Sequence, residues 1–299
     1  MSSFCSPNTT TVYCYDLNDL KKITTIYNKT HSTPISITKK STSKSLYNNL
    51  NKHLKNTLGD RSHFLWADYL IQFFNDDDQE AITLKEIADK RLMPKKPAEW
   101  SKNPRTWLSN FDIDKVLLHY HKTPLYNYHF IGVVPVDFGI KDSNGSCSYD
   151  ERCSIDMEKI IKRKKKYMGL VSNLDNHDGP GYHWTSLFFI IDPKLSNYGI
   201  YYYDSVASGI PPLMKVYIAD VQRQLKKIYG KQPKLFISRK KHQRKNTECG
   251  MFSIWYQIRW LNLLMTYNDQ ITFKEIIDVD IDDDLVAKYR DILYRPSVI

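Results

Sequence analysis

The segment from Cys249 to Leu264 constrains the fold most, because it is apolar on almost every side of a helix. A helix that is hydrophobic all round lies buried at the centre of a domain. The chain has 299 residues, which is enough for one large domain or for one domain with a smaller appendage. We therefore expect other elements to surround this helix, whose apolar side chains are Met251, Phe252, Ile254, Trp255, Ile258, Trp260 and Leu261.

Two neighbouring strands are predicted shortly before this helix. "WTSLFFII" (184–191) is a near-continuous apolar run, typical of the middle of a sheet, and "GIYYYD" (199–204) is a second strand. A tight turn centred on residues 193–194 would join them. In that register His183 and Asp204 face each other at the open end of the hairpin, with their Cβ atoms about 5 Å apart.

The remaining segments predict a mixture of helices and strands. Residues 1–50 are rich in Ser, Thr, Asn and Lys with weak periodicity, which indicates a loosely structured or accessory segment. Prolines between 93 and 104 indicate a linker, so we expect an accessory segment over 1–104 and a second domain over 105–299. Helices are expected near 63–74, 83–93, 106–121, 154–167 and 211–230, with Asp112 as a candidate N-cap of the third. Strands are expected at 130–138 and 234–240, and Pro135 indicates either an edge position or an early stop for the first of them.

The cysteines and the N-terminus argue against several classes of protein. Five cysteines without a CxxC pair favour a reducing compartment and argue against a disulfide scaffold. Cys147, Cys153 and His177 match no usual zinc spacing, so we expect no metal site there. "MSSFCSPNTT" lacks the basic and apolar regions of a secretion signal, and no apolar run reaches membrane-spanning length.

The net charge of +10 includes two basic runs, Lys162–Lys166 and Arg239–Lys245. For the first run a solvated surface is the favoured interpretation. The alternative is weak contact with a polyanion such as nucleic acid, although no nucleic-acid-binding motif accompanies either run.

Cys249 stands where a helix is expected to begin, and this position has a chemical consequence. The unpaired N–H groups and the dipole at a helix N-terminus favour a thiolate, which lowers the pKa of a cysteine from its usual value of about 8.5. A nucleophilic thiolate needs a base and an orienting group, and His183 with Asp204 supply that pair. Gln243 lies six residues before Cys249, where its amide could form an oxyanion hole with the Cys249 N–H.

The order of these residues resembles that in the cysteine proteases of the SUMO-protease and adenain clan. The resemblance spans roughly residues 105–265. The "ECGM" form and the chain length look most like the proteases of large DNA viruses, of the African swine fever virus and poxvirus type, which mature virion core polyproteins. The matching pieces are "YHW" (182–184), "YYYDS" (201–205), "HQRKNTECGMFS" (242–253) and "WLSNFDIDKVLLHY" (107–120), the last with Asn110 where an acidic residue is frequent in the family.

The resemblance implies catalytic roles and a fold. His183 is expected to act as the base, Asp204 as its orienter, Cys249 as the nucleophile and Gln243 as the oxyanion donor. The implied fold is α+β, a papain-like core with a central mixed sheet flanked by helices, plus a smaller, mainly helical N-terminal segment. No cofactor is implied.

The resemblance also implies a substrate class. Trp184 and Asn246 are expected to bind substrate, with Trp184 lining a narrow channel that accepts a Gly-Gly or Ala-Gly segment. The expected partner is a polyprotein or a ubiquitin-like protein with such a site. The expected location is the viral assembly site in the host cytoplasm, and the virion.

Three other readings of the chain remain open. An isopeptidase that removes SUMO or another ubiquitin-like modifier would use the same chemistry, so the site residues do not separate it from a polyprotein protease. A degenerate scaffold is disfavoured because every catalytic position is filled. A polyanion-binding module is the last of these readings, and it could accompany the protease activity.

Overall fold

The computed structural model describes residues 14–60 and 62–296, which belong to two compact units. The first unit runs to Ser101 and also takes in the chain from Arg290 onward, and the second spans Lys102–Tyr289. The sequence had placed 290–299 with the second domain. The structure groups residues 290–296 with the first unit instead, where the Tyr294 ring lies on Trp100, at 4.9 Å between centroids.

The first unit is helical. The expectation that residues 1–50 are loosely structured is wrong for the described part, because two helices form there, each with a buried stripe at helical spacing. Their exposed faces carry the Ser, Thr, Asn and Lys residues that dominate the composition, and this obscures the apolar stripe. The helices are α1 (Leu17–Thr30), α2 (Ser43–Leu58), α3 (Trp66–Ile71), α4 (Gln79–Arg91) and α11 (Arg290–Leu293), with 3-10 turns at His63–Leu65 and Ala98–Ser101.

The second unit has the expected α+β architecture, with a five-stranded mixed sheet in the order β1-β2-β3-β4-β5. The outer pairs β1–β2 and β4–β5 are parallel, and the inner pairs are antiparallel. Its strands are β1 (Tyr128–Val134), β2 (Tyr167–Asn173), β3 (Trp184–Ile190), β4 (Gly199–Tyr203) and β5 (Lys234–Ile237). Its helices are α5 (Asn110–Lys122), α6 (Met157–Lys162), α7 (Pro212–Tyr229), α8 (Cys249–Thr266), α9 (Phe273–Ile277) and α10 (Asp283–Ala287), with 3-10 turns at Pro124–Tyr126 and Glu151–Ser154.

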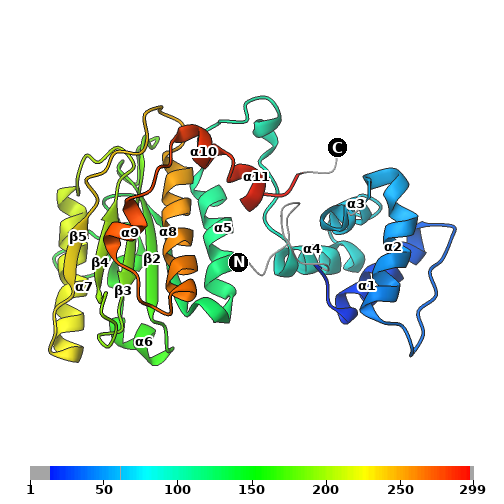
Figure 1. Ribbon diagram of the computed structural model, residues 1–299, viewed down its shortest axis with the longest axis horizontal. Coiled ribbons are helices and arrows are strands. Elements are labelled where there is room, and N and C mark those ends of the chain that lie inside the picture. The colour runs from blue at the N-terminus through cyan, green and yellow to red at the C-terminus, as the bar shows by residue number, and fades with distance from the viewer. Residues whose placement is uncertain (1–13, 61, 297–299) are drawn as a thin grey trace. The chain divides into compact units, whose positions relative to one another are not determined.

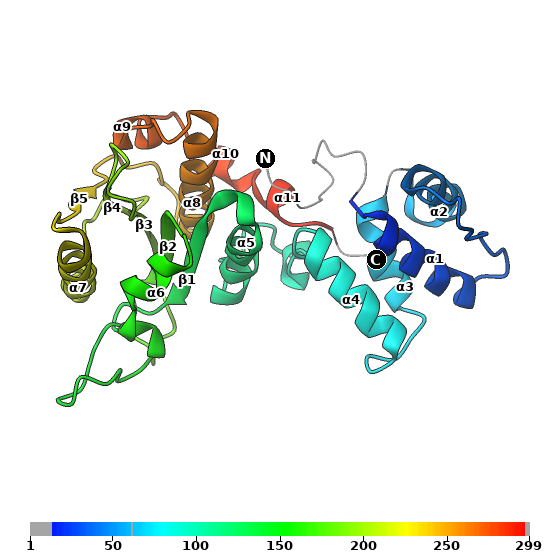
Figure 2. The ribbon, with the colours of Figure 1, turned by 90° about the horizontal axis from the view of Figure 1, so that it is seen from below.

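Helices cover both faces of this sheet, with α8 on one side and α7 on the other (Figures 1 and 2). On the α8 side, Phe188 and Tyr201 pack on Trp260, with ring centroids 5.1 and 4.6 Å apart. On the other side Phe189 and Ile200 join the core that α6 and α7 complete. Both faces of β3 are therefore buried, which explains its near-continuous apolar run. No helix among the described residues is long and apolar enough to cross a membrane.

One strand was missed by sequence reasoning. The helix expected over 154–167 ends at Lys162, and Tyr167–Asn173 forms β2, which pairs with both β1 and β3. The basic run before Tyr167 has no apolar periodicity of its own, so the sequence alone did not separate the end of a helix from the start of a strand. The strand expected near 130–138 is confirmed as an edge strand, β1, which stops before Pro135.

Two local expectations need correction. The β3–β4 register pairs Ser186 with Tyr203, which is shifted by two residues from the tight-turn register, because the connection between the strands is longer than a tight turn. The N-cap of α5 is Ser109, and Asp112 is instead the third helical residue of a capping box.

A disulfide joins Cys147 to Cys153. The cysteine pattern favoured a reducing compartment and argued against a disulfide scaffold, and this bond differs from that expectation. Their spacing of six residues matches no pattern that reveals a disulfide in a sequence, and only the fold of this loop brings them together.

Candidate active site

Cys249 is the first residue of α8, as the sequence predicted, and it is almost completely buried. A side chain at the next residue would be crowded, because a Cβ at Gly250 would lie 3.0 Å from the Leu108 Cβ and 3.2 Å from the Trp184 Cδ1. Two neighbouring segments therefore pack tightly against the start of the helix. The thiol is held in a fixed position at the end of the helix where the dipole favours negative charge.

His183 lies directly before β3 and Asp204 directly after β4, and the Nε2 of the histidine is 2.7 Å from Oδ1 of the aspartate. Asp204 is fully buried and also accepts hydrogen bonds from the N–H groups of Val206 and Ser208, each at 3.0 Å. Because Asp204 occupies Nε2, the Nδ1 of His183 is the ring nitrogen left for Cys249. The register shift in the hairpin did not prevent this contact, since both residues lie at the same end of neighbouring strands.

The Asp204 carboxylate has a further partner that sequence reasoning missed. The Ser208 hydroxyl also donates a hydrogen bond to Asp204. The run "DSVAS" (204–208) carries a signal that could have identified it, because small hydroxyl residues just after an aspartate favour such a turn.

The groups around His183 and Asp204 favour a protonated histidine beside an ionised aspartate. Burial lowers the pKa of His183, but the hydrogen bonds and charges of Asp204 and Cys249 outweigh it and raise that pKa to about 9. Burial raises the pKa of Asp204, but the bonds from His183, Ser208 and the Val206 N–H outweigh it and hold that pKa below its usual value. A histidine that stays protonated at neutral pH is the counter-ion that a nucleophilic thiolate needs.

We expect this pairing to set the alkaline limit of activity. The imidazolium of His183 should be fully present below its ordinary pKa and be lost as the pH rises through about 9, so kcat/KM should fall with a midpoint near that value. Asp204→Asn removes the negative charge that favours the imidazolium, so the midpoint should move to lower pH. A pH profile of kcat/KM for both proteins measures this, and an unchanged midpoint in Asp204→Asn would count against the electrostatic role of Asp204.

Gln243 is buried and held on both sides of its amide. Its Oε1 accepts from the Ser205 hydroxyl at 2.6 Å, and its Nε2 donates to the Lys245 carbonyl at 2.7 Å. The Lys245 carbonyl can only accept, so it fixes which end of the amide is the donor and takes one of the two N–H bonds. The oxyanion role predicted for Gln243 needs the second N–H bond.

Trp184 forms a rigid wall beside Cys249. Its indole Nε1 donates to the Leu108 carbonyl at 3.0 Å, and its ring lies against Gly250. A cavity of about 550 Å³ opens on this side, and its lining includes both Trp184 and Trp107. Asn246, the other residue expected to bind substrate, is exposed on the loop between Gln243 and Cys249. Within residues 14–60 and 62–296, no group of three or more His, Cys, Asp or Glu side chains is arranged to hold a metal ion.

Comparisons with known proteins return viral cysteine proteases, although no family model matches the chain. A cysteine protease of African swine fever virus (isolate Tick/Malawi/Lil 20-1/1983) is 26% identical over 211 residues, 69% of this chain and 74% of that protein. A thiol protease of Acanthamoeba polyphaga mimivirus is 25% identical over 181 residues, 59% of this chain and 55% of that protein. A crystal structure of the African swine fever virus protease matches with a TM-score of 0.61 at 19% identity, covering 99% of this chain and 97% of that one.

Proposed function

Because this chain is a cysteine protease of the family that includes the African swine fever virus protease, we propose that it cleaves polyproteins after Gly-Gly or Ala-Gly segments. The two relatives described above are viral proteins, and this supports a role in maturing viral core or structural polyproteins during virion assembly. Such a role would take place at assembly sites in the host cytoplasm and in the virion.

The proposed reaction follows from the arrangement of the side chains. The Cys249 sulfur attacks the carbonyl carbon of the scissile bond, and the oxyanion that forms accepts hydrogen bonds from the Cys249 N–H and the Gln243 amide. His183 gives its proton to the leaving amine, which departs and leaves a thioester. His183 then takes a proton from water, the water attacks the thioester, and the acid product leaves. Asp204 orients the imidazole and stabilises its positive charge throughout.

The observation that carries the glycine specificity is the tight packing beside Cys249. The Trp184 indole donates to the Leu108 carbonyl, and Trp184 and Leu108 both pack against Gly250, so this side of the site has little freedom to move. A rigid side chain that lines the channel excludes substrate side chains more strongly than a flexible one does. A substrate with glycine next to the cut therefore fits best.

A peptide panel tests this specificity. We expect cleavage after Gly-Gly and Ala-Gly, and a loss of roughly 1–3 kcal/mol in transition-state stabilisation when the glycine next to the cut becomes alanine, because the added methyl group overpacks the channel. An alanine several residues upstream, in the same peptide, is the control and should be tolerated. Product masses and kcat/KM values measure both effects, and equal cleavage of all peptides would contradict the proposal.

The same assay separates the alternative function. Fusions of SUMO or ubiquitin to a reporter carry a Gly-Gly terminus on a folded domain, whereas the peptides carry the motif alone. Modifier fusions cleaved far faster than matched Gly-Gly peptides would favour the isopeptidase. Comparable rates would favour the polyprotein protease, because that activity requires no modifier-binding surface.

A further inference from the structure

The segment after α8 is bonded to the loop that leads into Cys249. The Lys240 Nζ donates to the Val279 carbonyl at 2.9 Å, and the His242 Nε2 lies 3.0 Å from the Ile277 carbonyl oxygen. From α8 itself, the Arg259 Nε donates to the Ile276 carbonyl at 2.8 Å. The segment lies outside the motifs that indicated the protease, yet several of its contacts fall on the loop that carries Gln243.

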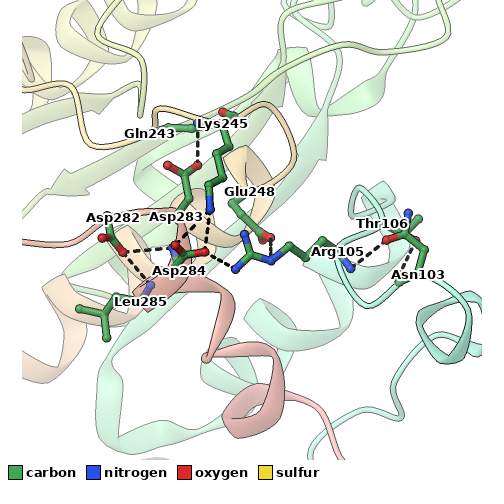
Figure 3. Close-up of polar contacts among 10 residues, drawn as sticks. All are labelled: Asn103, Arg105, Thr106, Gln243, Lys245, Glu248, Asp282, Asp283, Asp284 and Leu285. Atoms are coloured by element: carbon green, nitrogen blue, oxygen red, sulfur yellow. Dashed lines mark hydrogen bonds and ion pairs between the residues drawn. The ribbon is translucent and has the colours of Figure 1, made fainter.

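Asp283, at the start of α10, makes the most direct of these contacts. Its carboxylate accepts from the backbone N–H of Arg244 at 2.8 Å and from that of Lys245 at 3.2 Å. Figure 3 shows Asp283 beside Lys245. Asp283 is 2% exposed, so both bonds are shielded from water. Hydrogen bonds to a buried carboxylate are stronger than those between neutral groups, and removing the carboxylate leaves two N–H groups without their partner.

One residue, Lys245, connects these bonds to the Gln243 amide. Lys245 donates its N–H to Asp283 and accepts the Gln243 Nε2 on its carbonyl at 2.7 Å. On the opposite side, the Ser205 carbonyl accepts from the Gln243 N–H at 2.9 Å. The loop is thus held between the end of β4 and the start of α10, and the direction of the Gln243 amide depends on both.

Capping of α10 does not account for Asp283. The cap is the preceding residue, Asp282, whose carboxylate accepts from the N–H groups of Asp284 and Leu285 at 3.0 and 2.8 Å. The following residue, Asp284, has an exposed side chain that pairs with Lys245 and Arg105. Three consecutive aspartates therefore have three different sets of partners (Figure 3), and of the three Asp283 alone bonds the backbone beside Gln243.

We propose that Asp283 is a positioning residue for the oxyanion hole, which it serves by fixing the backbone that orients the Gln243 amide. This inference rests on the oxyanion role proposed for Gln243. Through Asp283, the segment after α8 contributes to the rate of the chemical step. Asp283 itself touches neither the thiol nor the imidazole.

The test compares substitutions at the three aspartates, using a peptide that the wild-type protein cleaves. Asp283→Ala should lower kcat by about 10- to 100-fold with KM within about twofold, since it weakens an oxyanion donor without removing it. Asp283→Asn keeps one acceptor oxygen and should recover part of that loss. Asp282→Ala and Asp284→Ala are the matched controls, and both should keep the wild-type kcat. A thermal melt of each variant separates loss of rate from loss of fold.

A double-mutant cycle shows whether Asp283 acts through Gln243. If it does, Gln243→Ala combined with Asp283→Ala should be no slower than Gln243→Ala alone, because the group being positioned is already gone. The rate at which iodoacetamide labels Cys249, mapped by mass spectrometry, should be unchanged in Asp283→Ala, because the Cys249–His183 pair is untouched.

Four results would overturn the inference: a normal kcat in Asp283→Ala, the same kcat loss in Asp282→Ala, fully additive losses in the cycle, or slowed labelling of Cys249. Other results would refute the proposed function itself. A wild-type protein that cleaves no glycine peptide refutes the substrate proposal, and a normal kcat in Gln243→Ala refutes the oxyanion role itself.

Discussion

Cys249→Ala is expected to reduce cleavage to the background rate, because the substitution removes the sulfur atom that forms the thioester. The fold should survive. Alanine differs from cysteine by one buried atom, so the loss in the free energy of unfolding should be about 1 kcal/mol. Rates at saturating peptide concentration, with a thermal melt of the same preparation, measure both. Wild-type cleavage in Cys249→Ala would refute the whole assignment.

His183→Ala should have the same effect on turnover, since the substitution removes the group that moves the proton. Asp204 would still accept bonds from Ser208 and Val206, so its buried carboxylate keeps partners. His177→Ala is a comparison variant, because its Nδ1 lies 2.7 Å from Asp137 in a pair that includes no cysteine, while His177 lines the same cavity as Trp184. It should leave kcat within a few-fold of wild type. A loss in His177→Ala as large as that in His183→Ala would show that the histidine assignment is wrong.

Gln243→Ala is expected to lower kcat by about 10²–10³ with little change in KM, which is the typical loss for one oxyanion donor and corresponds to about 2.7–4 kcal/mol. We expect kcat to fall and KM to stay nearly constant, because the oxyanion forms in the transition state and is absent from the bound substrate. Steady-state kinetics with one Gly-Gly peptide measure it.

Two further variants sharpen the Gln243 result. Ser205→Ala removes the hydroxyl that donates to the Gln243 Oε1 and should give a smaller loss of kcat. Gln222→Ala removes a glutamine amide from α7, where it donates to the Pro233 carbonyl at 2.8 Å, and should leave kcat unchanged. A change confined to KM in Gln243→Ala would mean that this residue binds substrate instead of stabilising the oxyanion.

Much of the fold was predictable because the relevant signals are local. The all-round apolar block predicted a buried α8 beginning at Cys249, and the apolar run at 184–191 predicted a central strand. The prolines and Gly230 gave the bounds of α7. By contrast, β2 was missed because its place depends on pairing with β1 and β3, and pairing partners cannot be read from a segment of this length on its own.

The sequence by itself determined the chemistry of the candidate site: a thiol at a helix start, a histidine and an aspartate at the ends of two neighbouring strands, and a glutamine six residues before the thiol. These features can be predicted from the sequence alone, because residue patterns place helix ends and strand ends to within a few positions. The tertiary structure alone decided which groups hold that site in place. The Ser205 hydroxyl on Gln243 and the Asp283 carboxylate on the Arg244 and Lys245 N–H groups are such contacts. Asp283 lies 38 residues from Lys245 in the chain, and at that separation only the packed fold determines which polar groups meet.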